Sequence, residues 1–176
     1  MIDIRFAAVE MDALDELGTE ALLVTHFVEE RPIQGVIGLL DFRFCGLLAR
    51  RTQEGFISGR AGEAVLLSGR PRLPVPKVLL WGLGPVATFE PELHGPSQTR
   101  LALQTLCRLG VRSAAMVLAG RSVGKASAER AMGTLLAELE QVAIDEVLVF
   151  EAPEAQRTMV QVMEQQRRVR WVREHA

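Results

Sequence analysis

The stretch Gly120-Arg121-Ser122-Val123-Gly124-Lys125-Ala126-Ser127 contains the residue types of a phosphate-binding loop. An apolar run precedes it and a helical pattern follows, so its backbone N–H groups would lie at a helix start, which attracts anions. A P-loop has four residues between its glycines and a Ser or Thr directly after its lysine, whereas this stretch has three and then Ala126. The spacing argues against a nucleotide triphosphatase. It predicts a simpler anion site formed by Gly120, Arg121, Ser122, Gly124 and Lys125, and the alternative is a plain helix start capped by Ser127.

A second glycine turn, Gly82-Leu83-Gly84, directly follows the apolar run at residues 78–81. A strand that ends in G-x-G opens many dinucleotide sites. Here Ala87 stands where the third glycine would be, and Pro85 removes an N–H group that a phosphate would bind. The residues favour a tight turn, and Gly82 and Gly84 are kept as a second place for an anion.

Other residues that could do chemistry are scattered along the chain. His26, His94 and His175 lie far apart, with no H-E-x-x-H pattern and no cluster with cysteine, and each is expected to be a surface or hydrogen-bonded residue. Cys45 and Cys107 fall in apolar helical patterns, so we expect two reduced core thiols. No G-x-S-x-G nucleophile elbow occurs. The residues therefore predict no catalytic residue, no metal and no cofactor.

The elements that would position these turns alternate between strands and helices. The apolar periodicity predicts strands at residues 2–6, 20–27, 64–67, 77–82, 113–118, 146–150 and 169–172. It predicts helices at residues 11–17, 36–51, 97–109, 127–142 and 153–167. Such alternation is typical of a largely parallel sheet with helices on both faces. We therefore expect one α/β domain over residues 1–176, with three α/β/α layers, a mixed, mostly parallel sheet, and adjacent central strands at 78–81 and 115–118.

Composition and charge limit the class of protein. The chain has 176 residues, of which 48% are hydrophobic and 24% charged, as in ordinary globular proteins. The net charge of −2 argues against a nucleic-acid partner, although residues 1–30 carry −7 and residues 31–130 carry +8. The basic middle could face an anionic ligand, or the acidic ends could neutralise it. No signal peptide and no apolar run of about 20 residues occurs, so we expect no membrane span and a cytoplasmic protein.

Two short motifs stand in sequence in the middle of the chain. A loop with the residues Phe56, Gly59, Arg60, Gly62 and Glu63 is similar to F-x-G-K-x-G-E, with one extra residue after the phenylalanine. Residues 77–84 are similar to a K-V-L-L-V-G-L-G strand, with Trp81 in place of an aliphatic residue. Their order resembles the N-terminal domain of the leucyl aminopeptidase family, the cytosol aminopeptidases, over about residues 20–150. The resemblance implies a macro-domain-like fold.

The resemblance also bears on function. That family's metal ligands lie in a C-terminal domain marked by F-D-x-G-G and N-T-D-A-E-G-R, and neither sequence occurs here. The resemblance therefore implies a non-catalytic accessory domain that mediates oligomerisation or contact with a protein partner. One alternative is a module that binds ADP-ribose or another nucleotide, as macro domains do. Another is an enzyme subunit that acts with a separate aminopeptidase catalytic chain.

The C-terminal segment is the expected contact surface. The predicted helix at residues 153–167 has more apolar surface than one buried stripe requires, and Trp171 lies in the predicted edge strand that follows. Trp and Arg are enriched at the centres of interfaces. The alternative is that Trp171 covers the core of this chain.

Overall fold

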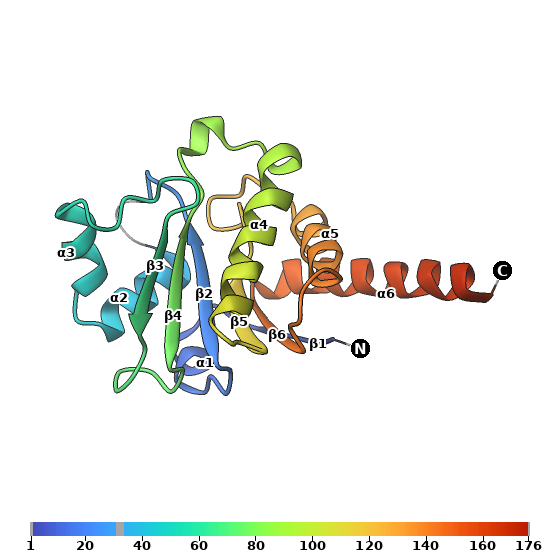
Figure 1. Cartoon of the computed structure of the whole chain (residues 1–176), viewed down its shortest axis with the longest axis horizontal. Helices are drawn as coiled ribbons and strands as arrows, with labels where there is room; N and C mark the ends of the chain where they lie inside the picture. Colours follow the sequence, from blue (N-terminus) through green and yellow to red (C-terminus); the bar gives the residue numbers. More distant parts are fainter. Residues whose placement is uncertain (1, 31–33, 176) are drawn as a thin grey trace.

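The chain forms one six-stranded sheet, to which the N-terminal segment contributes β1 (Figure 1). The computed structural model describes residues 2–30 and 34–175. The sheet has the order β1-β6-β5-β2-β4-β3, and only the β3–β4 pair is antiparallel. The strands are β1 (Asp3–Ala7), β2 (Ala21–His26), β3 (Ala64–Ser68), β4 (Lys77–Gly82), β5 (Ser113–Val117) and β6 (Glu146–Phe150).

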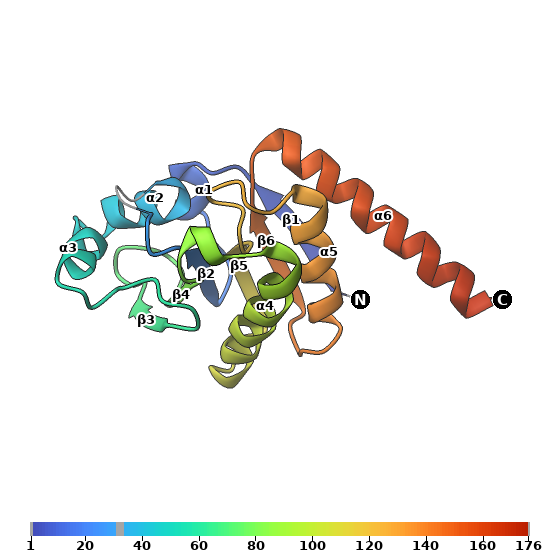
Figure 2. The same ribbon diagram turned by 90° about the horizontal axis from the view of Figure 1, so that it is seen from above.

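Helices cover both faces of this sheet (Figure 2). They are α1 (Met11–Asp15), α2 (Gly35–Arg43), α3 (Leu47–Gln53), α4 (Pro91–Arg108), α5 (Ala128–Leu139) and α6 (Pro153–His175), with a short 3-10 helix η1 (Val86–Thr88). Helices α1, α2 and α3 pack on one face, and α4, α5 and the first turns of α6 pack on the other. The fold is therefore a three-layer α/β/α sandwich with a mixed, mostly parallel sheet, as predicted.

Strand β2 lies in the middle of the sheet, and all six of its residues are buried. Leu22 and Val24 face the layer of α1, α2 and α3, whereas Leu23 faces the layer of α4 and α5. A strand covered on both faces buries every side chain, which explains the unbroken apolar run ALLV in this part of the sequence.

The predicted adjacency of residues 78–81 and 115–118 is wrong. Both segments lie inside the sheet, but β2 is inserted between β4 and β5. The connection through α4 passes over β2, and β2 pairs in parallel with both neighbours. Chain order alone does not show such an insertion, because parallel crossovers can skip a strand position.

The predicted strand at residues 169–172 is also wrong, because α6 continues to His175. The prediction followed from Val169, Trp171 and Val172, which favour strands. However, neither Gly nor Pro interrupts the sequence after Pro153, and β1 already occupies the outer edge of β6. Trp171 is 62% exposed and does not cover the core.

Among the described helices, none combines the length and apolar character that a membrane crossing requires.

A left-handed turn divides the helix predicted at residues 36–51 into α2 and α3. Cys45 and Gly46 have φ values of 55° and 76°, which end α2 and direct the chain into α3. Both cysteines are free, but Cys45 is exposed and not a core residue, whereas Cys107 is half-buried and packs against the core. Helical periodicity continued across the turn in sequence, which concealed the break.

Helix α4 begins six residues before the predicted start at residue 97, with Pro91 at its first position. The imidazole Nδ1 of His94 accepts a hydrogen bond of 2.9 Å from the backbone N–H of Glu90, so it caps the helix start. Pro96 lies inside the helix, where proline is usually disfavoured. At the other end Gly110 adopts a φ of 73° after Leu109, as expected for a residue that follows a helix.

Candidate functional site

The loops at the carboxyl ends of the parallel strands leave the sheet toward opposite faces. The loop after β2 leads to α2 on one face, whereas the loops after β4 and β5 lead to α4 and α5 on the other. Such a reversal beside a central strand is a topological switch point, and open α/β sheets bind their ligands there. We call residues 27–30, 83–90 and 118–127 the switch-point loops; η1 marks this end of the sheet at the top of Figure 1.

Direct contacts join these three loops. The backbone N–H of Val86 donates to the carboxylate of Glu29 at 2.9 Å, which connects the β4 and β2 loops. Below them the rings of Phe27 and Phe89 meet edge to face, with centroids 5.1 Å apart. A Cβ atom at Gly120 would lie 3.0 Å from the Phe89 ring, so the β5 loop approaches closely because this residue is glycine. The loops therefore form one packed surface.

The β5 loop is a closed turn held by its own backbone. The N–H of Gly124 donates to the Arg121 carbonyl at 3.1 Å, and the N–H of Ala126 donates to the Gly120 carbonyl at 3.0 Å. Gly120 and Gly124 have φ values of 79° and 69°, in the region that favours glycine. Ser127 then caps α5, since its hydroxyl accepts a hydrogen bond of 3.2 Å from the backbone N–H of Arg130. The predicted N-cap is thus confirmed, and the turn feeds directly into a helix N-terminus.

Arg121 does not extend toward solvent from this turn. Its Nε donates to the Glu151 carboxylate at 2.6 Å, and its Nη1 donates to the Ala126 carbonyl at 2.7 Å. The two ion-paired side chains are 18% and 10% exposed. Arg121 therefore fastens the β5 loop to the end of β6, and Glu151 balances its charge.

The other two side chains of the predicted anion site, Lys125 and Ser122, are exposed. Lys125 forms no ion pair with any described residue of the chain. Ser122 hydrogen-bonds the carboxyl group of Glu30, which comes from the β2 loop. The structure thus brings the predicted glycines, Ser122 and Lys125 together in one turn, with Lys125 as the cation available to a ligand.

Glu30 is a feature of this region that the sequence did not single out. Its carboxylate accepts a 2.6 Å hydrogen bond from the backbone N–H of Phe27. Burial raises the pKa of Glu30, and the hydrogen bonds from Phe27 and Ser122 offset only part of that rise. A half-buried acid with a raised pKa at a switch point is a marker of a functional site. Its position depends on the loop conformation, so residue spacing gave no signal of it.

The N–H groups of Gly82 and Gly84 are already used. That of Gly82 donates to the Glu63 carbonyl at 2.9 Å, and that of Gly84 donates to the Gly59 carbonyl at 2.8 Å. A Cβ atom at Gly82 would collide with the backbone of Gly59 and Arg60. These two glycines therefore let the 59–63 loop lie directly against the end of β4.

Glu63 organises that loop. Its carboxylate accepts hydrogen bonds from the Ser58 N–H at 2.9 Å, the Ser58 hydroxyl at 2.6 Å and the Gly59 N–H at 2.9 Å. Burial alone would raise the pKa of Glu63, but these hydrogen bonds and the nearby His26 lower it. The motif that resembled F-x-G-K-x-G-E is thus a structural clasp in this chain.

His26, the last residue of β2, is buried beside this clasp. Burial lowers the pKa of His26, against the opposing effects of Glu63 and of a hydrogen bond with the Phe27 backbone. Its Nε2 has no hydrogen-bond partner among the described residues. The side chain of His175 lies outside the described side chains. Within residues 2–30 and 34–175, no three His, Cys, Asp or Glu side chains gather as metal ligands.

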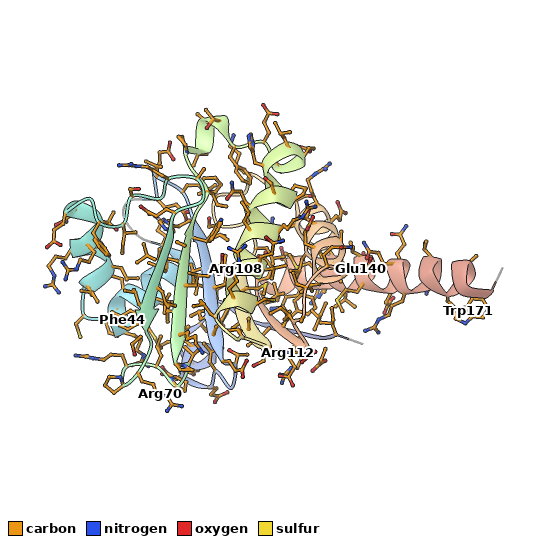
Figure 3. All side chains as sticks on the ribbon, viewed as in Figure 1. Phe44, Arg70, Arg108, Arg112, Glu140 and Trp171 are labelled. Carbon is orange, nitrogen blue, oxygen red and sulfur yellow. The ribbon has the colours of Figure 1, made fainter. Side chains whose placement is uncertain are left out.

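A surface hollow of about 790 Å³ lies elsewhere, between the end of α2 and the β3–β4 connection. Its lining includes the exposed Phe42 and a contact of 3.0 Å between Arg72 Nη1 and Cys45 Sγ. This hollow is wide open and lies away from the switch point, beside residues that precede β4. Figure 3 labels Phe44 and Arg70, which are neighbours in the chain of residues that line it. Topology therefore favours the switch-point loops as the functional site, and the volume of this hollow does not outweigh that argument.

Comparison with known proteins supports this view of the fold. No protein-family model and no curated protein matches the chain. Among solved structures, it is similar to a mutant tomato leucine aminopeptidase, with a TM-score of 0.64 and 15% identity over 93% of this chain but only 36% of the aminopeptidase.

Two macrodomains match over most of their own length. The Oceanobacillus iheyensis macrodomain with MES bound gives a TM-score of 0.66 and 14% identity, covering 86% of each chain. The Trypanosoma brucei macrodomain in complex with ADP gives 0.65 and 19%, covering 92% of this chain and 69% of that one. At these identities the similarity shows the fold alone, and that fold is macro-domain-like.

Proposed function

We propose that this chain binds a nucleoside diphosphate ligand, ADP-ribose or a related nucleotide, at its switch-point loops. The observation that carries the proposal is the closed glycine turn at residues 120–127, which stands at the switch point and leads into α5. A diphosphate at this position would receive hydrogen bonds from N–H groups of the turn other than those of Arg121, Gly124 and Ala126, which already donate to carbonyls of the same loop. It would also meet the positive end of the helix dipole. Lys125 would add a point charge from the surface.

The comparisons support the same ligand class. The Trypanosoma brucei macrodomain of similar fold holds ADP. A second structure of the Oceanobacillus iheyensis macrodomain, with a TM-score of 0.62, also contains ADP. In this chain, Arg121 is committed to Glu151, so backbone N–H groups and Lys125 carry the recognition of the anion.

Calorimetric titration of ADP-ribose, ADP and inorganic phosphate against the protein tests the proposal. Lys77 is the one other lysine of the chain and begins β4 at the opposite end of the strands, so Lys77→Ala is a matched control. We expect ADP-ribose to bind the wild type and Lys77→Ala equally. We expect Lys125→Ala to weaken binding about tenfold, the size of one charge-assisted contact.

Equal affinity of the wild type and Lys125→Ala for ADP-ribose would show that the anion lies elsewhere. Absence of binding by all three ligands would reject nucleotide recognition. That result would leave a second candidate, a non-catalytic accessory module that mediates oligomerisation or contact with a protein partner. The observation that favours this second candidate is the exposed distal part of α6 (Figures 1 and 2).

A further inference from the structure

Helix α6 leaves the body of the protein before it ends. Met159 is buried against the core, and Val162 and Met163 pack beside it. The described side chains from Glu164 onward are all exposed, and both ribbon views show this part of the helix projecting beyond every other element (Figures 1 and 2). A projecting helix of about three turns gains little stability in water without a contact. We call residues 164–175 the distal helix.

The distal helix has a basic and partly apolar surface. Its sequence contains four arginines and two glutamates. Arg167 and Arg168 are exposed, and Val169, Trp171 and Val172 are 47%, 62% and 56% exposed. Figure 3 labels Trp171 near the end of the helix. Trp171 lies about 160° around the helix from Val169, so the helix lacks the single wide apolar face of a membrane-surface helix. This arrangement fits a partner that offers carboxylates together with some apolar contact.

The chain itself presents such a surface around α1. Glu10, Asp12 and Glu16 are exposed, and none of them forms an ion pair with another described residue. Val9, beside them, is 39% exposed. We call these four residues the acidic surface of α1. The distal helix of the same molecule cannot reach it, because it points away from α1 in both views (Figures 1 and 2).

We propose that the chain forms a two-fold dimer in which the distal helix of each copy binds the acidic surface of α1 on the other. The two contacts are then identical, and they close the assembly without leaving either surface free. Complementary charge sets the partner and the register of such an interface. This inference is independent of nucleotide binding, and it gives the accessory function a surface and an occupant.

Charge reversal at the two surfaces tests the dimer directly. The helix variant combines Arg167→Glu and Arg168→Glu, and the α1 variant combines Asp12→Lys and Glu16→Lys. The control combines Arg70→Glu and Arg108→Glu, two exposed arginines that belong to neither surface and are labelled in Figure 3. Mass is measured by light scattering and sedimentation over about a hundredfold range of protein concentration, because dimerisation follows mass action. Circular dichroism checks that every variant remains folded.

We expect the wild type and the control to be dimers that dissociate in high salt, because exposed charges are screened. Each charge-reversal variant alone should be a monomer. An equimolar mixture of the two should regain the dimer mass, because both contacts in the mixed pair are again attractive. A wild type that stays monomeric overturns the proposal, and so does a mixture that stays monomeric.

Two further assays test whether the distal helix binds an anionic membrane or DNA in place of a second copy of the chain. Vesicles of anionic phospholipid and a random-sequence DNA duplex are each incubated with the wild type and with the helix variant. Capture of the wild type alone by either probe, with no dimer in solution, would show that the distal helix serves an anionic surface and not a second copy. Calorimetry with ADP-ribose on the same variants shows separately whether nucleotide binding is retained.

Discussion

At the scale of single residues, the switch-point loops combine a cation and an acid with opposite consequences for an anionic ligand. Lys125 is exposed at the turn that leads into α5, whereas Glu30 reaches the same turn through Ser122. Burial raises the pKa of Glu30, so its carboxyl gains a proton at a higher pH than an exposed glutamate does. While charged, it repels a bound diphosphate.

This repulsion predicts a pH dependence of ligand binding. As the pH falls through the raised pKa of Glu30, its charge disappears while the diphosphate stays ionised, so affinity for ADP-ribose should rise as the pH is lowered from neutrality, at a higher pH than an exposed glutamate would cause. Glu30→Gln should bind more tightly at neutral pH, and its affinity should vary less with pH. Glu29→Gln is the matched control next in sequence. Calorimetry at several pH values measures both, and an unchanged slope in Glu30→Gln would contradict the assignment.

Sequence alone pointed to part of this candidate site. The spacing of Gly120, Gly124 and Lys125 was visible because a turn between an apolar strand and a helix is a local pattern. The partner of Arg121 was not visible, since Glu151 lies 30 positions away and meets it only when β5 and β6 pair. The burial of Glu30 and of His26 was not visible for a similar reason: it depends on loops from other strands.

At the scale of elements, the pair formed by Arg121 and Glu151 connects the β5 loop to the start of α6. Glu151 also accepts a hydrogen bond of 2.9 Å from the N–H of Ala152, next to Pro153 at the helix start. Removal of one partner from such a buried pair leaves an uncompensated charge. The pair therefore fixes the position of the candidate site relative to the sheet.

We expect Arg121→Ala to lower the free energy of unfolding by about 3 kcal/mol, because Glu151 would stay buried without its partner. Lys125→Ala, four positions further along the same loop, should change it by less than about 0.5 kcal/mol because its side chain is exposed. Urea unfolding followed by circular dichroism measures both variants. Equal stability of the two variants would mean that the ion pair does not hold the loop.

Elements were predicted best where the pattern was long and uninterrupted. The six observed strands were all expected from their apolar runs, since burial on one or both faces dictates those residues. The error at residues 169–172 arose because strand propensity reflects packing surroundings, and these residues have none of a strand's neighbours.

At the scale of the whole molecule, the placement of β2 between β4 and β5 creates the candidate site. Had β4 and β5 been adjacent, as the sequence suggested, both of their following helices would lie on one face without a reversal between them. Because β2 is inserted and its following helix α2 lies on the opposite face, the loop after β2 leaves the sheet in the opposite direction from the loops after β4 and β5. The architecture is thus a stronger predictor of the ligand's position than any single motif.

The most direct test of this central claim is to locate the ligand by nuclear magnetic resonance. Backbone amide signals of the uniformly 15N-labelled protein are followed while ADP-ribose is added. The account predicts large shifts at residues 120–127 and at Phe27 to Glu30, with little change around the hollow near Arg72. Shifts centred on that hollow, or the absence of shifts throughout the titration, would contradict it.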